Sequence, residues 1–381
     1  MKKILILAIF AMTCSSLWAD DFESILLQIE QNNSTLRAVR DGVEAEKAEN
    51  HTALTLADPE VEYSHYWGAP SAVGGRNDFS VSQALDFATL FGVKRQMARS
   101  KDELADVNYE ERRLEVLMEA SRLLVDVVYY NRCLDRHRSQ QQEMKRAVEL
   151  SEKAFKAGRI NRLDLNKPRL ALAELNATVA EEEMLREEAL LRLKQLNGGN
   201  VVTIGQIDYS VPQSMAHGRL SVNKQREEAE QRVAENEVRM AKSQSMPQLT
   251  VGYASELTRD EKFRGITVGM SVPLWNNKNN VKRAKAQQQA ARSKQQDVLF
   301  HIQSEYENQK ARTERLRQYA QTLAENVPEL SSKVVLHDAF ERGDISALDY
   351  YLELTSDYEL QHKALLAERD YQQALVVLAW Y

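Results

Sequence analysis

The sequence is poor in cysteine and proline, and it has no long apolar stretch beyond its N-terminus. It holds two cysteines and seven prolines among 381 residues. We expect Cys14 to be lost with a signal peptide, so Cys133 would have no partner, and a disulfide within the chain is excluded. No run of 18 apolar residues occurs after residue 19, which excludes a transmembrane helix in that part of the chain.

A surplus of positive charge is missing too. The chain has 50 lysines and arginines against 56 aspartates and glutamates, a formal net charge of −6. Loss of Lys2 and Lys3 with the signal peptide would leave 48 basic residues against 56 acidic ones, a charge of −8. This balance argues against nucleic acid as a partner.

Motifs of catalysis and of metal binding are also missing. The sequence contains no HExxH, GxSxG, Walker or GxGxxG pattern, so we predict that the protein is not an enzyme and needs no cofactor. Cys133 and His137 lie four residues apart and could hold a soft metal ion together. One such pair lacks the four ligands of a closed site, so no metal site is predicted.

The N-terminus has the pattern of a secretory signal peptide over residues 1–19. Lys2 and Lys3 precede an apolar run, and a small residue, Ala19, follows at a suitable distance. We expect cleavage after Ala19, and lipidation at Cys14 is the alternative.

One short stretch occurs twice. AFKAGRINRLDL at 154–165 and AFERGDISALDY at 339–350 share six identical positions at an offset of 185. Such self-similarity predicts a repeated architecture. Each copy has the pattern of a tight turn between two helices. The glycine can adopt the left-handed conformation that often follows the end of a helix. The Asn or Ser can cap the start of the next helix, and the aspartate three residues later completes a capping box. These residues are Gly158, Asn161 and Asp164 in the first copy, and Gly343, Ser346 and Asp349 in the second.

Hydrophobic periodicity predicts a mainly α-helical chain with a small β part, arranged as two repeats. The predicted helices cover 22–57, 88–156, 162–197, 221–245, 279–340 and 346–380, although the apolar pattern fades across 135–146, where we expect solvated faces. The predicted hairpins are 60–67 with 77–86, and 247–257 with 265–275. The resulting division is signal peptide 1–19, first repeat 20–199, linker 200–217 and second repeat 218–381.

The strands alternate apolar and polar residues over about ten positions, which is the length and pattern of a transmembrane barrel strand. Four strands cannot close a barrel, because a small closed barrel needs about eight. We therefore expect several chains to share one barrel. Aromatic residues near the strand ends are predicted to lie at the bilayer interface: Tyr66, Trp67, Phe87, Phe91 and Trp275.

The duplicated helix–hairpin–helix plan, the signal peptide, the AFxxGxxxxLD turn and SVPLW at 271–275 resemble the TolC-type outer-membrane efflux protein family. The resemblance covers essentially all of the chain after the signal peptide. It implies a homotrimer in the lipid of the cell outer membrane, with a 12-stranded β-barrel continuous with a coiled-coil α-helical barrel in the periplasm. It also implies partners: a periplasmic adaptor and an inner-membrane RND or ABC transporter. The chain departs from the family at Asn32-Asn33-Ser34, where the family has NNP.

The resemblance further implies that acidic residues at the periplasmic helix tip constrict the pore. Asp349 falls on such a position and Asp164 is its counterpart in the first repeat. The next acidic position of the family is Leu352 here, with Glu353 beside it. Arg159 and Arg342 flank the two turns and are expected to pair with these carboxylates.

The resulting hypothesis is an exit duct for drugs or metal cations in a tripartite efflux pump, opened at its helix tips by its partners. Two alternatives stay open. A type I protein-secretion duct shares this architecture, and a periplasmic coiled-coil scaffold or adaptor would have no pore of its own.

Overall fold

The computed structural model describes residues 22–52, 54–69, 74–205, 208–209, 218–273, 278–327 and 332–381. The predicted signal peptide, most of the predicted linker and Trp275 lie outside these residues. The elements, in chain order, are α1 (Phe22–Asn32), α2 (Ser34–Thr52), β1 (Glu60–Trp67), β2 (Gly75–Leu85), α3 (Phe87–Leu90), α4 (Val93–Lys156), α5 (Arg162–Leu196), α6 (Arg219–Ser243), β3 (Gln248–Leu257), β4 (Lys262–Ser271), α7 (Lys278–Asn326), α8 (Ser332–Arg342) and α9 (Ala347–Ala379). The predicted fold class, long helices with four strands, is confirmed.

The chain folds into two compact units. The first consists of Met1–Asn32, Glu119–Pro212 and Arg315–Val376, and the second of Asn33–Met118, Gln213–Glu314 and Val377–Tyr381. Each unit therefore takes segments from both predicted repeats, and α4, α7 and α9 contribute residues to both units. No helix in the described part of the chain is long and apolar enough to cross a membrane.

Three of the predicted helices are split, because α1 and α2 replace 22–57, α3 and α4 replace 88–156, and α7 and α8 replace 279–340. The prediction of a single helix over 22–57 is wrong, because Asn33 ends α1 and starts α2. Its side-chain oxygen accepts the backbone N–H of Leu36 at 2.9 Å, as an N-cap does. The helix before it is amphipathic, with Phe22, Ile25 and Ile29 fully buried on one stripe.

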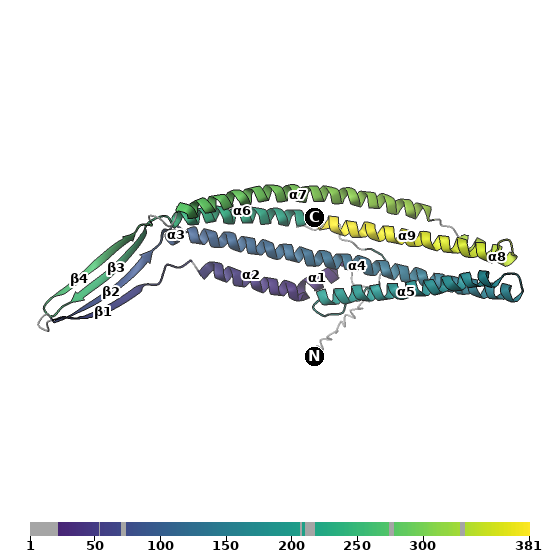
Figure 1. The fold of residues 1–381 in the computed structure, drawn as a ribbon, viewed down its shortest axis with the longest axis horizontal. Coiled ribbons are helices and arrows are strands. Elements are labelled where there is room, and N and C mark those ends of the chain that lie inside the picture. The colour runs from purple at the N-terminus through teal and green to yellow at the C-terminus, as the bar shows by residue number, and fades with distance from the viewer. Residues whose placement is uncertain are drawn as a thin grey trace, which may run out of the picture. The chain divides into compact units, whose positions relative to one another are not determined.

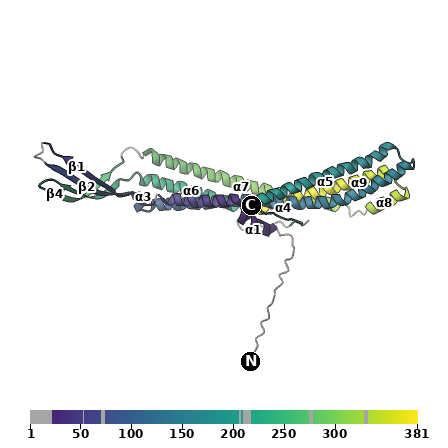
Figure 2. The ribbon, with the colours of Figure 1, turned by 90° about the horizontal axis from the view of Figure 1, so that it is seen from below.

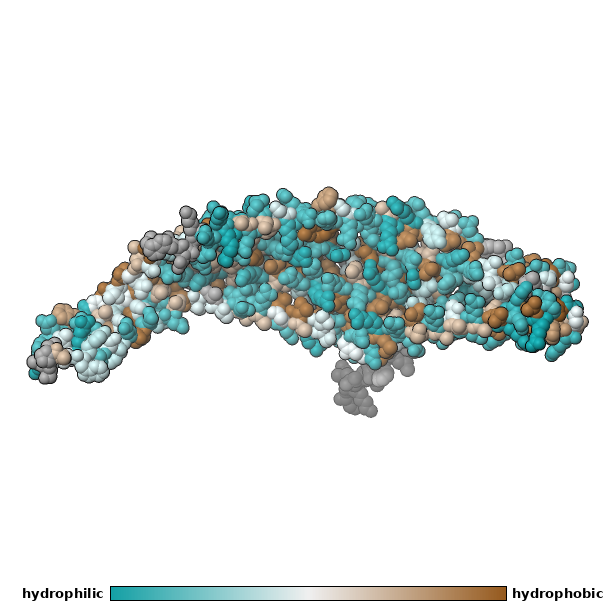
Figure 3. All heavy atoms as spheres, in the orientation of Figure 1, coloured by the Kyte–Doolittle hydropathy of each residue, from teal (hydrophilic) through white to brown (hydrophobic). Residues whose placement is uncertain are grey.

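The first unit is built around the middle of α4. Leu124, Val125, Val127 and Val128 are all fully buried, so a broad face of the helix is covered here, while Arg122 stays exposed on the other side. In both views α4, α5 and α9 run side by side in this unit (Figure 1, Figure 2). Hydrophilic residues cover most of the visible helical surface (Figure 3).

The fading apolar pattern over 135–146 has a different cause from the one predicted. The helix keeps a buried stripe through this region, at His137, Gln140, Met144 and Ala147, spaced by three and four residues. The stripe looks polar in the sequence because a histidine and a glutamine occupy two core positions. The expectation of solvated faces is therefore wrong for His137 and Gln140.

The second unit holds one open antiparallel sheet of order β1-β2-β3-β4 (Figure 1). The central pair, β2 with β3, joins the two predicted hairpins. In the helical part of this unit an ion pair joins α4 and α6, because Arg226 donates to both carboxylate oxygens of Glu111 at 2.8 Å. Apolar contacts of Val238 and Ala241 with Ala284 hold α6 against α7.

The two copies of the repeated stretch form the same turn in the first unit. Gly158 and Gly343 have φ values of 71° and 80°, a left-handed conformation that suits glycine. The next residue donates its backbone N–H to the carbonyl five positions back, Arg159 to Ala154 at 2.9 Å and Asp344 to Ala339 at 2.8 Å. This is the bonding of a Schellman motif, which satisfies the last carbonyls of a helix.

A graded series of Gly→Ala substitutions tests this geometry. At Gly158 nothing lies within 4 Å of an added Cβ, so only the left-handed backbone is strained, at a cost of about 1–2 kcal/mol. At Gly198, with φ of 64°, the added Cβ would also collide with the Asn32 backbone carbonyl, so the cost is larger.

Gly42 is the matched control, because it lies inside α2 with open space around it. Gly42→Ala should stabilise the protein by about 0.4–1 kcal/mol. Thermal unfolding of the purified chain should therefore rank Tm as Gly42→Ala, wild type, Gly158→Ala, Gly198→Ala. A Gly158→Ala variant as stable as Gly42→Ala would contradict the left-handed turn.

Candidate functional site

The sheet has two chemically different faces. Residues directly opposite each other in an antiparallel ladder lie on the same face, so the register assigns every strand position. One face, called here the apolar face, carries Val61, Tyr63 and Trp67 of β1, Phe79, Val81 and Leu85 of β2, Leu249, Val251, Tyr253 and Leu257 of β3, and Ile266, Val268 and Met270 of β4. The register places Gly75 and the polar residues His65, Asn77, Gln83, Ser255, Lys262 and Arg264 on the same face.

Much of the apolar face is exposed in the single chain. Trp67 is 85% exposed, Ile266 80% and Val268 73%. All ten residues of β4 are exposed, which leaves this strand uncovered on both sides. Contiguous exposed apolar residues of this kind mark a surface that meets lipid or another protein.

The opposite face, called here the polar face, is formed by the alternate residues. They are Glu60, Glu62, Ser64 and Tyr66 of β1, Arg76, Asp78, Ser80, Ser82 and Ala84 of β2, Gln248, Thr250, Gly252, Ala254 and Glu256 of β3, and Phe263, Gly265, Thr267, Gly269 and Ser271 of β4. Hydroxyls, glycines and carboxylates dominate it. The two faces thus differ as the alternation in the sequence predicts.

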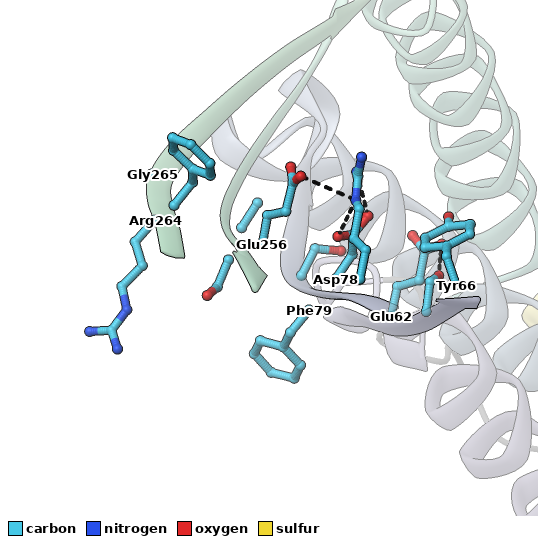
Figure 4. Close-up of a pocket in the computed structure, with 13 residues that line it drawn as sticks. Glu62, Tyr66, Asp78, Phe79, Glu256, Arg264 and Gly265 are labelled. Atoms are coloured by element: carbon cyan, nitrogen blue, oxygen red, sulfur yellow. Dashed lines mark hydrogen bonds and ion pairs between the residues drawn. The ribbon is translucent and has the colours of Figure 1, made fainter. Parts of the chain in front are cut away.

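A shallow hollow on the polar face gathers charged residues from three strands (Figure 4). Arg76 donates to both oxygens of Asp78, at 2.8 and 2.6 Å, and its Nε lies 3.2 Å from Glu256. Glu62 also lines the hollow, so the polar face contributes three carboxylates and one guanidinium to it. Arg264 points away from this group in Figure 4. The hollow therefore has an anionic surplus.

The predicted interface aromatics fall in different places. Trp67 lies on the apolar face, whereas Tyr66 lies on the polar face with the Arg76 guanidinium 5.6 Å from its ring centre. Phe87 and Phe91 stack at 5.7 Å around α3, directly after β2. Trp275 is outside the described residues.

The turns of the first unit present the predicted tip carboxylates. Asn161 accepts the Asp164 backbone N–H at 2.9 Å, and Ser346 accepts that of Asp349 at 3.1 Å. The Ser346 hydroxyl also donates to the Asp349 carboxylate at 2.6 Å. Asp349 is thus held by a cap while its side chain stays exposed.

Glu353 shares a helix face with Asp349, because it follows four residues later on α9. Both side chains are exposed. Within the described part of the chain neither makes an ion pair. Two carboxylates one turn apart give the start of α9 a concentrated negative charge.

The expected arginine partners do not reach these carboxylates. Arg342 pairs with Asp344 at 3.3 Å instead of Asp349. Asp164 is met by Lys167 at 3.4 Å, and Arg159 forms no ion pair with any residue that the structure describes. The exposed carboxylate of Asp349 is therefore available to a partner.

The two turns differ in how their apolar residues pack. Phe340 stacks on Tyr350 at 5.0 Å, and Tyr350 joins a core with Met144 and Leu354. In the first turn Phe155, the counterpart of Phe340, is 40% exposed, whereas Leu165, the counterpart of Tyr350, is buried. Leu163 is 74% exposed, so the first turn has Phe155 and Leu163 on its surface.

A buried polar cluster inside the first unit was not predicted. Atoms of Cys133, Glu182 and His362 lie within 4.8 Å of one another, and His137 bonds Glu182 at 2.7 Å. Burial and the nearby Glu182 raise the pKa of the Cys133 thiol to about 12. Only the spacing of Cys133 and His137 was visible in the sequence, because the other two residues come from α5 and α9.

Neither a protein-family profile nor a curated protein matches the sequence. Solved structures do match. A membrane protein from Pseudomonas aeruginosa has a TM-score of 0.79 at 15% identity, covering 94% of this chain and 89% of that one. CusC, whose structures concern folding and transmembrane channel formation, has a TM-score of 0.78 at 14% identity, covering 95% of this chain and 94% of that one. The outer-membrane channel OprN has a TM-score of 0.77 at 15% identity, covering 94% of this chain and 88% of that one.

This chain has the fold of outer-membrane channel proteins. The match covers nearly all of it, so both units and the sheet are included. At this level of identity the likeness concerns the backbone, and the chemistry of the faces and turns has to be judged from this chain's own residues.

The two caps should be interchangeable. Asn161→Ala and Ser346→Ala each remove the acceptor for a backbone N–H and should cost about 0.5–2 kcal/mol. The exchanges Asn161→Ser and Ser346→Asn keep an acceptor of similar capping strength and should leave Tm close to that of the wild type. Circular dichroism melts of the four variants check this. Exchanges that lower Tm as much as the alanine variants would show that the side chains do more than cap.

Proposed function

We propose that the protein is an outer-membrane duct through which an efflux pump of the cell envelope exports its substrates. The observation that carries this proposal is the two-faced open sheet, in a chain whose fold matches outer-membrane channels over nearly its full length. An exposed apolar face suits contact with lipid, and the polar face suits a water-filled lumen.

The sheet needs partners to close. Four strands leave β1 and β4 as edges with unpaired backbone groups, and such edges are not tolerated in the hydrocarbon region of a membrane. Three chains would supply 12 strands, with β4 of one chain beside β1 of the next. We therefore propose a homotrimer in the outer membrane, with the helices in the periplasm.

The charges of the two sites would make the duct prefer cations over anions. The polar face carries Glu62, Asp78 and Glu256 against Arg76, and α9 begins with Asp349 and Glu353. If both groups line the passage, three copies of each repel anions and attract cations. This supports export of cationic compounds or metal cations rather than of anions.

We propose that the tip turns form the gate. The carboxylates of Asp349 and Glu353 make no ion pair with any residue that the structure describes, so closure would rest on weak contacts between exposed charged groups, worth about 0–1 kcal/mol each. A periplasmic adaptor docked on the exposed Phe155 and Leu163, together with an RND or ABC transporter of the inner membrane, could favour the open state by its differential affinity.

Two other functions share parts of this evidence. A type I secretion duct would use the same fold with a protein substrate. A periplasmic scaffold is disfavoured by the uncovered apolar face of the sheet, which a soluble protein would have to bury. Membrane fractionation distinguishes a scaffold from a duct, because a scaffold is extracted from the cell envelope without detergent and a duct is not.

The face assignment predicts opposite results at adjacent positions. Val268 lies on the apolar face and Thr267 on the polar face. An arginine facing lipid near the midplane costs about 2–4 kcal/mol, whereas the lumen tolerates it. Native mass spectrometry in detergent should find trimers for wild type and Thr267→Arg, and a reduced yield of trimer for Val268→Arg. A stable monomeric wild type would overturn the shared barrel, and equal effects of the two variants would overturn the face assignment.

The gate is tested by separating the charge of Asp349 from its capping role. Asp349→Asn removes the charge but keeps an oxygen that can accept from Ser346. We expect higher conductance and lower cation selectivity in planar bilayers. Ser346→Ala removes the cap and keeps the charge, so it should lower Tm without changing selectivity. Glu44→Ala, at an exposed position on α2, controls for net charge. Unchanged conductance and selectivity in Asp349→Asn would show that the residue only caps its helix.

A further inference from the structure

A polar cluster lies within the helical core of the first unit, apart from the faces and turns described above. α4 contributes Cys133 and, one turn later, His137; α5 contributes Glu182; and α9 contributes His362. Cys133 is 0% exposed, His137 6% and Glu182 5%. The rings of His137 and His362 stack at 5.8 Å, so the two histidines bring α4 and α9 into contact.

The cluster converges on one carboxylate. His137 Nδ1 lies 2.7 Å from Glu182 Oε2, and donor atoms of Cys133, Glu182 and His362 lie within 4.8 Å of one another. Burying a carboxylate is costly unless its charge is compensated. A thiol and two imidazoles placed around it are a donor set that binds metal ions.

One nitrogen of the cluster has no partner. His362 Nδ1 is buried, and no residue in the described part of the chain forms a hydrogen bond with it. A buried polar atom left unpaired destabilises the folded state. Such an atom in a native core needs an explanation, and coordination of a cation is one that also accounts for the neighbouring carboxylate and thiol.

We propose that Cys133, Glu182 and His362 form a binding site for a borderline-soft divalent cation, Zn²⁺ in the first place, which joins α4, α5 and α9. Zinc accepts sulfur, nitrogen and oxygen donors at about 2.0–2.3 Å in a tetrahedron, which puts the donors roughly 3.3–3.8 Å apart. The observed spread of up to 4.8 Å requires the side chains to close by about one ångström around the ion. Mg²⁺ and Ca²⁺ prefer all-oxygen sites and do not suit this set.

His137 is a positioning residue in this arrangement. Its ring nitrogen holds the Glu182 carboxylate from outside the three donors, in the way that outer partners orient metal ligands. The ion would be a fixed part of the helix wall rather than transported cargo, because Cys133 and Glu182 are buried and His362 is half-buried. The proposal does not depend on the duct function.

The test is zinc binding by the full chain, purified in detergent and stripped with a chelator. Dialysis against Zn²⁺ and metal analysis should give one ion per chain. Cys133→Ser and His362→Gln should weaken binding by at least tenfold, and His137→Gln by about 10–100-fold. His51→Gln removes an exposed histidine that pairs with Asp102, and it should bind zinc as the wild type does.

Two further measurements keep the result decisive. Zn²⁺ should raise Tm of the wild type and of His51→Gln, but not of Cys133→Ser, because only a folded site gains from the ion. Co²⁺ bound to the wild type should show the charge-transfer absorption of a thiolate ligand, which decides the matter even if a variant fails to fold. A wild type that binds no zinc, or Co²⁺ bound without the thiolate band, would overturn the site.

Discussion

An open sheet with unpaired edges is the constraint on which the rest of this structure depends. Backbone N–H and C=O groups of β1 and β4 need partners, and the side chains of the apolar face need a covering. Water can satisfy the edges but not the apolar face, and lipid can cover the apolar face but not the edges. Pairing of edge strands between chains within a membrane would meet both demands at once, which is why we propose an assembly.

The alternation of apolar and polar side chains along the strands determines what the second face of the sheet presents. Because successive side chains point to opposite faces, a sheet with one face against lipid must present Glu62, Asp78, Thr267 and their neighbours to the other side. Glycines and hydroxyls on the polar face leave room, and the Arg76 group shows that charge is tolerated there. In the proposed duct, the same residues that a globular protein would place in contact with water form the lining.

The helical unit combines tightly packed and weakly held parts. The middle of α4 buries a broad face, whereas the turns have exposed carboxylates and, in the first copy, exposed apolar residues. The proposed gate must open at a small cost in free energy, so its contacts have to be weak. This division therefore suits a rigid helical wall with turns that can move at its periplasmic end. The buried Cys133 cluster belongs to the wall, where an ion would tie three helices together.

Most of the secondary structure could be predicted from the sequence alone, because local patterns decide it. The period of the apolar residues identified the helices and strands, and Gly158 and Gly343 marked turns whose backbone only glycine adopts without strain. The faces of the sheet followed from alternation once the strands were paired. The break at Asn33 was missed because a buried asparagine reads as an ordinary helix residue until its cap is seen.

The tertiary structure alone decided which distant groups meet. His137 and Glu182 are 45 residues apart in the chain, and no periodicity relates them to each other or to His362. Arg342 pairs with the neighbouring Asp344 rather than with Asp349, and an exposed ion pair is too weak to hold the arginine on the more distant carboxylate. The spacing of residue types determines local secondary structure, whereas a site built from three helices exists only after the helices have packed.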